Sequence, residues 1–201
     1  MFDEQQEKWI KRTEGLFLRY GIKSITMDDV ARELGISKKT LYQFVESKDD
    51  LVNKVVERHI EVEKNICATQ FPNLANAIEE MFLVIETNAQ QMSQMKANIV
   101  YDMQKYHREA WEKMEHFQMG FLYSVVRSNL ERGMGEGLYR ADIDVDITSK
   151  LHIAQSFALF DEKIFPQGQY KRETLFKEYL THYLHGIVSD KGRSIIKAKL
   201  T

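Results

Sequence analysis

The chain has 201 residues, of which 43% are hydrophobic and 29% charged, with 28 basic and 30 acidic side chains. This composition is that of a folded globular protein, and it excludes a disordered chain and a strongly basic one. Because residues 1–58 carry basic and acidic side chains in equal number, nucleic-acid binding must depend on where the charges lie, not on how many there are.

Helical signals begin at the start of the chain. A first helix is predicted over residues 4–20, because apolar side chains recur there at helical spacing and a glycine follows as a stop. Thr26 and Asp29 stand three residues apart in a capping-box pattern, which predicts that a short second helix begins after Thr26. Ser47 and Asp50 repeat the pattern and predict the start of a fourth helix.

Residues 26–48 have the pattern of a helix, a turn, a third helix that runs to about Phe44, and the start of the fourth. Gly35 permits a positive φ in the turn, and Ile36 can fix the angle between the two helices by its burial. A helix-turn-helix places its second helix in the major groove of DNA, with the N-terminal residues nearest the base edges. Those residues are Lys38, Lys39 and Thr40, followed by Tyr42 and Gln43.

Lys38, Lys39 and Lys48 lie in the first turns of their predicted helices. A cation there opposes the helix macrodipole at a cost of roughly 0.3–1 kcal/mol. Three such placements are expected if DNA phosphates supply the missing anions. The alternative is three solvated lysines near neighbouring carboxylates, and the chemistry of the turn favours the DNA-binding interpretation.

The segment from Thr26 to Leu51, TMDDVARELGISKKTLYQFVESKDDL, resembles the signature of the TetR family of transcriptional regulators, and the resemblance extends over roughly residues 8–60. It implies an all-α fold. An N-terminal three-helix helix-turn-helix DNA-binding head, residues 1–48, is expected to join a larger helical-bundle body for ligand binding and dimerisation, residues 49–201.

The resemblance also assigns roles within the head. Thr26 and Lys48 are expected to contact phosphates, and Tyr42 to pack on the DNA backbone. The groove-facing residues are expected to be Lys38, Lys39 and Thr40. The family usually has glycine where Lys39 stands and often lysine where Glu46 stands, so these departures bear on the operator sequence and not on the DNA-binding role.

Longer helices are predicted in the rest of the chain, over about residues 73–92, 96–106, 109–132, 145–164 and 171–188. Helices 145–164 and 171–188 carry apolar residues on more than one face, and a helix that is apolar on two sides must bury both. We therefore expect them to pair with a second copy, as the resemblance also implies, in a homodimer that binds a palindromic double-stranded DNA operator. The last dozen residues either extend the final helix or fray.

The middle helices are rich in methionine and aromatic residues. This pattern fits an ordinary core with methionine as filler, or the wall of an apolar ligand cavity. Because members of the TetR family commonly bind a small molecule there, we expect an apolar or amphipathic effector whose binding moves the fourth helix and releases DNA. The tentative ligand-binding residues are Met95, Tyr101, Gln104, His107, Trp111, Phe117 and Phe121.

No catalytic centre or cofactor motif is apparent in the sequence. Residues 133–137, GMGEG, lack the spacing of a nucleotide-binding loop. Glu178, His182 and His185 lie along one predicted helical face and could hold a metal, although polar positions on an interface or surface are the simpler explanation. We expect a ligand-responsive transcriptional regulator that acts as a repressor, not an enzyme, with no cofactor. The alternative is a DNA-binding protein whose body only dimerises.

The sequence also predicts a cytoplasmic protein without membrane association. Residues 1–7 are acidic and polar, unlike a secretory signal peptide, and the longest apolar runs are too short to span a bilayer. The single cysteine, Cys67, excludes an internal disulfide and suits a reducing compartment.

Overall fold

A computed structural model of the protein describes residues 3–94, 98–166 and 168–200. These residues form helices and no named strand, and one isolated antiparallel bridge joins Tyr139 and Val188. The predicted all-α fold class is confirmed. In this part of the chain, no helix is both long enough and apolar enough to cross a membrane.

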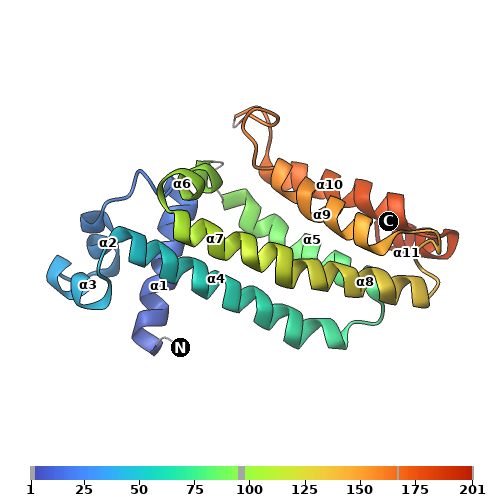
Figure 1. The fold of residues 1–201 in the computed structure, drawn as a ribbon, viewed down its shortest axis with the longest axis horizontal. Helices are drawn as coiled ribbons and strands as arrows, with labels where there is room; N and C mark the ends of the chain where they lie inside the picture. Colours follow the sequence, from blue (N-terminus) through green and yellow to red (C-terminus); the bar gives the residue numbers. More distant parts are fainter. Residues whose placement is uncertain (1–2, 95–97, 167, 201) are drawn as a thin grey trace. The chain divides into compact units, whose positions relative to one another are not determined.

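The elements follow one another as α1 (Glu4–Tyr20), α2 (Met27–Leu34), α3 (Lys38–Phe44), α4 (Lys48–Gln70), the short 3-10 helix η1 (Phe71–Asn73), α5 (Ala77–Gln94), α6 (Asn98–Tyr106), α7 (Arg108–His116), the π-helical turn η2 (Phe117–Leu122), α8 (Tyr123–Gly135), α9 (Val145–Ala158), α10 (Arg172–Ile187) and α11 (Asp190–Leu200) (Figure 1).

The helices form two compact units, each with its own hydrophobic core. Unit 1 contains Met1–Asn65 and Gln94–Phe117, and unit 2 contains Ile66–Ser93 and Gln118–Thr201. Side chains of α6 and α7 belong to the same core as those of the first helices, so unit 1 is larger than a three-helix head. The expected boundary at residue 48 separates a DNA-binding head from a body for ligand binding and dimerisation. This division by function stays a prediction.

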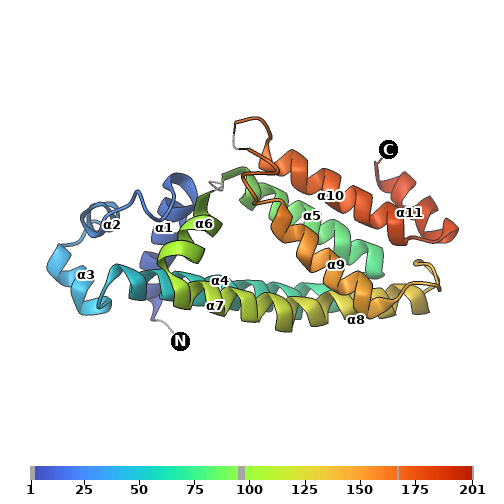
Figure 2. The ribbon, with the colours of Figure 1, turned by 45° about the horizontal axis from the view of Figure 1, so that its top comes forward.

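Unit 1 is built on helix ends that the sequence specifies. The bounds of α1 agree with the prediction, and Asp3 caps the helix. The Thr26 hydroxyl accepts the N–H of Asp29 at 3.2 Å and the Asp29 carboxylate accepts the N–H of Thr26 at 3.0 Å, which confirms the predicted capping box of α2. Further along the unit, α4 and α7 run side by side in Figures 1 and 2, joined by a 2.6 Å ion pair between Lys113 and Glu57.

The capping box predicted at the start of α4 forms only in part. The Ser47 hydroxyl accepts the N–H of Asp50 at 3.1 Å, as expected. The Asp50 carboxylate, however, accepts the N–H of Glu46 at 2.9 Å and pairs with Lys54 at 2.5 Å. The carboxylate therefore bonds to Glu46, the residue before the cap, and to Lys54, one turn along the helix. It does not accept the backbone N–H of Ser47, so the second half of the capping box does not form.

Unit 2 contains a buried polar network between α5 and α8. Arg132 forms ion pairs with Glu80 and Glu136, and Asn129 donates to Glu80 at 2.7 Å. Asn129 also donates to the carbonyl of Ala77 at 2.9 Å. Because buried polar groups are costly unless they are paired, this network fixes the start of α5 against the end of α8.

Tyr139 closes this network from the loop that follows α8. Its hydroxyl lies 3.1 Å from the carbonyl oxygen of Ala77 and 3.0 Å from the amide oxygen of Asn129. The Tyr139 ring lies against Gly133, where any Cβ would overlap the ring carbons. Position 133 is therefore restricted to glycine by the aromatic ring and not by its backbone conformation.

Helix α9 ends at Ala158. The sequence predicts a later end, at about residue 164. Asp161 accepts the N–H of Lys163 at 2.8 Å, and a local bond of this kind competes with helical hydrogen bonding. Arg172, at the start of α10, donates to the carbonyl of Leu159 and holds the connection in place.

The residues after α10 neither extend that helix nor fray, so both expectations are wrong. The N–H of Ser189 donates to the carbonyl of Leu138 at 2.9 Å, and its hydroxyl donates to the carbonyl of Gly137 at 2.8 Å. The same hydroxyl accepts the N–H of Gly192 at 3.2 Å and so helps to start α11. The C-terminal helix is therefore a separate element, held against the loop that follows α8.

Only one of the two helices predicted to have two apolar faces does so. Ile147 and Leu151 of α9 are 55% and 54% exposed, so α9 has large apolar side chains on the surface of unit 2 as well as in its core. The prediction is wrong for α10, because its large apolar side chains are buried or half-buried within the unit and its outward residues are polar. The buried side chains of α10 are Phe176, Leu180, Tyr183, Leu184 and Ile187.

Candidate nucleic-acid interface

The turn between α2 and α3 has the geometry that the sequence predicts. Gly35 adopts φ 72° and ψ 30°, a left-handed conformation that favours glycine. The N–H of Ile36 donates to the carbonyl of Ala31 at 3.0 Å, which satisfies the end of α2. The Ile36 side chain packs against the core of unit 1, and its burial fixes the direction in which α3 leaves the turn.

Helix α3 buries one side and exposes the other. Leu41 is fully buried and Val45 almost so, and they hold the helix against the core. The exposed side chains are Lys38, Lys39, Tyr42 and Gln43. Thr40 is half-buried, and its hydroxyl lies 2.8 Å from that of the capping residue Ser37, so its groove-facing role stays a prediction.

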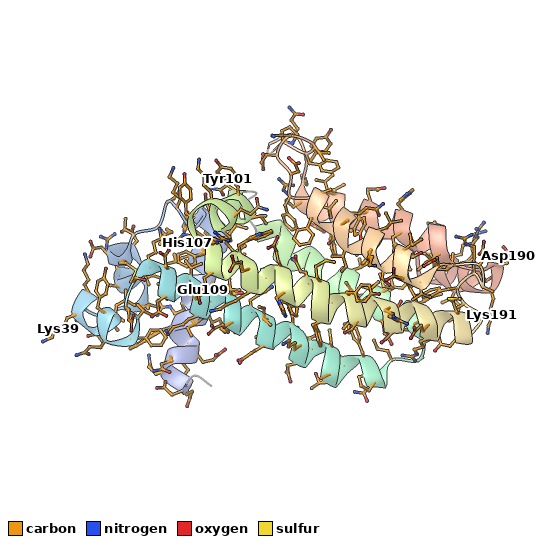
Figure 3. The ribbon with its side chains drawn as sticks, in the orientation of Figure 1. Lys39, Tyr101, His107, Glu109, Asp190 and Lys191 are labelled. Atoms are coloured by element: carbon orange, nitrogen blue, oxygen red, sulfur yellow. The ribbon has the colours of Figure 1, made fainter. Side chains whose placement is uncertain are left out.

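The two lysines at the start of α3 differ in charge environment. Lys38 pairs with Asp28 at 3.0 Å, and this hydrogen bond raises the pKa of Lys38. Within the described part of the chain, Lys39 has no hydrogen-bond or ion-pair partner, and Figure 3 shows it at the outer end of α3, pointing away from the other helices of unit 1. The cation that opposes the helix dipole without compensation is therefore Lys39.

The two predicted phosphate contacts flank this helix. The Thr26 hydroxyl donates to the Asp29 carboxylate at 2.6 Å, so a phosphate would compete with the cap of α2. Lys48 is half-buried at the first position of α4, and burial lowers its pKa against the opposing charges of Asp102 and Asp49. Both roles stay predictions.

Asp102 is a residue that the sequence did not single out. Its carboxylate is buried on α6, accepts the backbone N–H of Lys23 at 3.0 Å and acts on the ammonium of Lys48. It therefore joins the α1–α2 connection to α6, and its charge favours the ammonium of Lys48 at the start of α4. One feature of the sequence could have indicated its role: Asp102 is an acidic residue on the apolar face of a predicted helix, between Ile99 and Met103.

The tentative ligand-binding residues that belong to unit 1 lie in different surroundings. Tyr101 and Gln104 are exposed on α6. His107 is buried and bonded to Asp49, and Trp111 packs on the core of unit 1. Of the others, Met95 lies outside the described residues, Phe117 is buried in unit 1, and Phe121 is half-buried in unit 2. Their role in binding an effector stays a prediction.

Unit 1 has a shallow, open depression of about 380 Å³, lined by Leu16, Tyr20, Ile25, Asp29, Arg32 and Glu33. None of the predicted ligand-binding residues lines it. Among the described residues, no group of three or more His, Cys, Asp or Glu side chains is placed to hold a metal ion, so Glu178, His182 and His185 do not form such a site.

Comparison with known proteins adds to this geometry. A family model described as "Bacterial regulatory proteins, tetR family" matches residues 10–55. The HTH-type transcriptional regulator YvaF of Bacillus subtilis (strain 168) is 26% identical over 172 residues, which are 84% of this chain and 88% of YvaF. The HTH-type transcriptional repressor KstR2 of Mycolicibacterium smegmatis is 20% identical over 195 residues, 94% of this chain and 93% of KstR2.

The whole fold is also similar to that of solved structures. A protein from Saccharomonospora viridis in complex with choline superimposes with a TM-score of 0.73 at 16% identity, over 92% of this chain and 97% of that one. At this identity the similarity concerns the fold alone.

Proposed function

Because the chain belongs to the TetR family of transcriptional regulators, we propose that it is a ligand-responsive repressor that binds a palindromic operator as a homodimer and is released by a small molecule. The observation that supports this most is the outward face of α3, which the Gly35 turn and the burial of Leu41 present away from the core. This role requires neither a catalytic centre nor a cofactor, and the relatives are regulators rather than enzymes.

The proposed reading of DNA follows from the side chains on α3. Lys39 and Gln43 are four residues apart and share one helical face, where an ammonium can donate to guanine and an amide can pair with adenine in the major groove. Tyr42, 44% exposed, packs on the sugar-phosphate backbone beside them. Thr26 and Lys48 contact the flanking phosphates and set the register.

The proposed dimer uses the outward face of α9. Ile147, Leu151 and Ala154 are exposed at helical spacing, and apolar faces of this kind are buried when two copies meet. The polar outward face of α10, with His182 and His185, lines the same contact. Two heads related by a twofold axis require a palindromic operator.

The proposed effector is an apolar or amphipathic small molecule that favours one of two states of the protein. A ligand can release DNA only through its difference in affinity for the DNA-bound and free states. The similar fold that was solved with choline supports a body able to hold a small molecule. The alternative, a body that only dimerises, predicts no such ligand.

The first experiment selects binding sites from a random duplex library with the purified protein. A palindromic consensus that is lost with Lys39→Ala and retained with Lys177→Ala, an exposed lysine of α10, supports the operator-binding role. Absence of enrichment, or binding that depends on salt alone, contradicts it. A panel of apolar and amphipathic compounds is then tested for release of the selected site, and a panel without effect favours the alternative.

The dimer is tested by sedimentation of the Leu151→Glu variant against Lys11→Glu, an exposed position of α1 in unit 1. We expect the first variant to sediment as a monomer, because a charge on the apolar face opposes association, and the second to remain a dimer. Equal masses for both variants would show that α9 does not form the contact.

A further inference from the structure

An exposed group of two lysines and two tyrosines lies on unit 1 away from α3. Lys23 comes from the connection between α1 and α2, and Tyr101, Lys105 and Tyr106 come from α6. Figure 3 shows Tyr101 on the outer side of α6. We call these four residues the lysine–tyrosine patch.

The two ammonium groups of the patch share one phenol. The Nζ of Lys105 donates to the Tyr101 hydroxyl at 2.9 Å and lies 5.3 Å and 5.4 Å from the ring centroids of Tyr101 and Tyr106. The Nζ of Lys23 donates to the Tyr106 hydroxyl at 3.3 Å and lies 5.2 Å from the centroid of that ring. Tyr106 is therefore in contact with two cations.

Within the described residues, neither ammonium of the patch forms an ion pair with a carboxylate. Elsewhere in unit 1, Lys38, Lys54 and Lys113 each pair with an acidic side chain. In the patch, the hydrogen bond from Lys23 lowers the pKa of Tyr106, and the phenols raise the pKa of Lys105. Two like charges next to one neutral ring form a positive surface that attracts an anion.

The patch is continuous with the candidate nucleic-acid interface. The backbone N–H of Lys23 donates to Asp102, and the charge of Asp102 also acts on Lys48 at the start of α4. Lys23 precedes Thr26, the cap of α2, by three residues. The patch and both residues expected to contact phosphates therefore belong to the same unit, and Asp102 links Lys23 of the patch with the charge of Lys48.

We propose that the lysine–tyrosine patch binds the phosphate backbone of duplex DNA beside the segment read by α3, so that the DNA-binding surface extends onto α6. The two ammonium groups pair with phosphate oxygens, and the phenol hydroxyls, no longer needed as acceptors, donate to the same oxygens. Such contacts add affinity without sequence preference. This inference rests on the proposed operator-binding function.

The test compares wild type with the Lys23→Gln/Lys105→Gln variant on the selected operator across a salt series. Each lost phosphate contact reduces the slope of log affinity against log salt by about 0.9, so we expect a reduction of about 1.8. Between about 50 and 200 mM salt, the affinity of the wild type should then fall about tenfold more than that of the variant. Discrimination between the operator and a scrambled duplex should not change.

The matched control is Lys150→Gln/Lys177→Gln, which removes two exposed lysines of unit 2 that each pair with an acid one turn away. Circular dichroism and the melting temperature verify that both variants are folded. A patch variant with the salt slope of the control overturns the inference and leaves the proposed function standing. A wild type that selects no DNA sequence overturns both.

Discussion

The Nδ1 atom of His107, buried at the junction of α6 and α7, lies 2.5 Å from a carboxylate oxygen of Asp49 in the first turn of α4. Helix α4 follows α3, the second helix of the helix-turn-helix, after a connection of three residues. This bond therefore joins the segment just after the helix-turn-helix to the two later helices of unit 1, as the position of His107 in Figure 3 illustrates.

We expect Asp49→Ala to lower the free energy of unfolding by about 1–2 kcal/mol, because the buried imidazole loses its partner. Asp49 also interacts with the dipole of α4, so the same substitution is made in a His107→Phe background to isolate the pair. Urea unfolding of the four proteins measures the coupling. An equal loss in both backgrounds would mean that the pair contributes nothing.

Gly133→Ala should destabilise the protein by about 1–3 kcal/mol, because the new methyl group overlaps the ring of Tyr139 and overpacks the polar network. Gly135→Ala is the control in the same helix, where a Cβ meets nothing within 4 Å. It should be neutral or slightly stabilising, as alanine is in helices. Thermal melts measure the change in melting temperature of each variant. If both substitutions lowered it equally, the role assigned to the Tyr139 ring would be refuted.

His152 should make the protein less stable in mild acid. Its ring is buried beside those of Tyr179 and Tyr183, and burial lowers its pKa to about 4 from 6.5. The unfolded chain takes up a proton below pH 6.5 and the folded chain does so only near pH 4. Stability is therefore full above pH 6.5 and falls as the pH drops, by about 2 kcal/mol at pH 5.

The control for this pH dependence is His152→Phe, which keeps an aromatic ring and removes the titrating group. The loss between pH 7 and pH 5, measured by urea unfolding, should be smaller in the variant. His59 acts in the opposite direction: burial opposes its charge, but Glu14 at 3.2 Å outweighs this and raises the pKa of His59 above 6.5. Its contribution is present at low pH and lost as the pH rises through that value, so only the difference between wild type and variant reports on His152.

Lys39→Ala should weaken operator binding more than Lys38→Ala. Lys38 already pairs with Asp28, and part of its charge is compensated before DNA arrives. A lost base contact costs about 1–3 kcal/mol, and a lost phosphate contact reduces the salt slope by about 0.9. Fluorescence anisotropy on the selected operator gives both quantities. Equal losses from the two substitutions would show that the Asp28 pair opens on binding.

The local chemistry of unit 1 could be predicted from the sequence because it depends on neighbours in the chain. The cap at Thr26, the left-handed Gly35 and the bounds of α1 each follow from residues within one or two helical turns. The same local pattern at Ser47 was only half right. Asp50 is drawn to Lys54, and a spacing rule does not include that competitor.

Long-range partners could not be predicted in this way. Helical periodicity indicates which face of α6 is apolar, but not that Asp102 on that face meets Lys23. It also did not predict that Tyr101 lies exposed beside a lysine, because an aromatic residue has the same pattern in a core, a cavity wall or a surface patch. The end of α9 at Ala158 depends likewise on Arg172, which comes from the next helix.

Helix α3 contains seven residues, fewer than a helix needs to persist alone in water. Its shape is maintained by the burial of Leu41 and by the Ser37 cap, and therefore by the rest of unit 1. The proposed sequence recognition is therefore expected to require the folded unit, and we expect an isolated peptide of α3 not to retain it. On heating, operator affinity should report the melting of unit 1 itself, whereas the helical signal averages over both units.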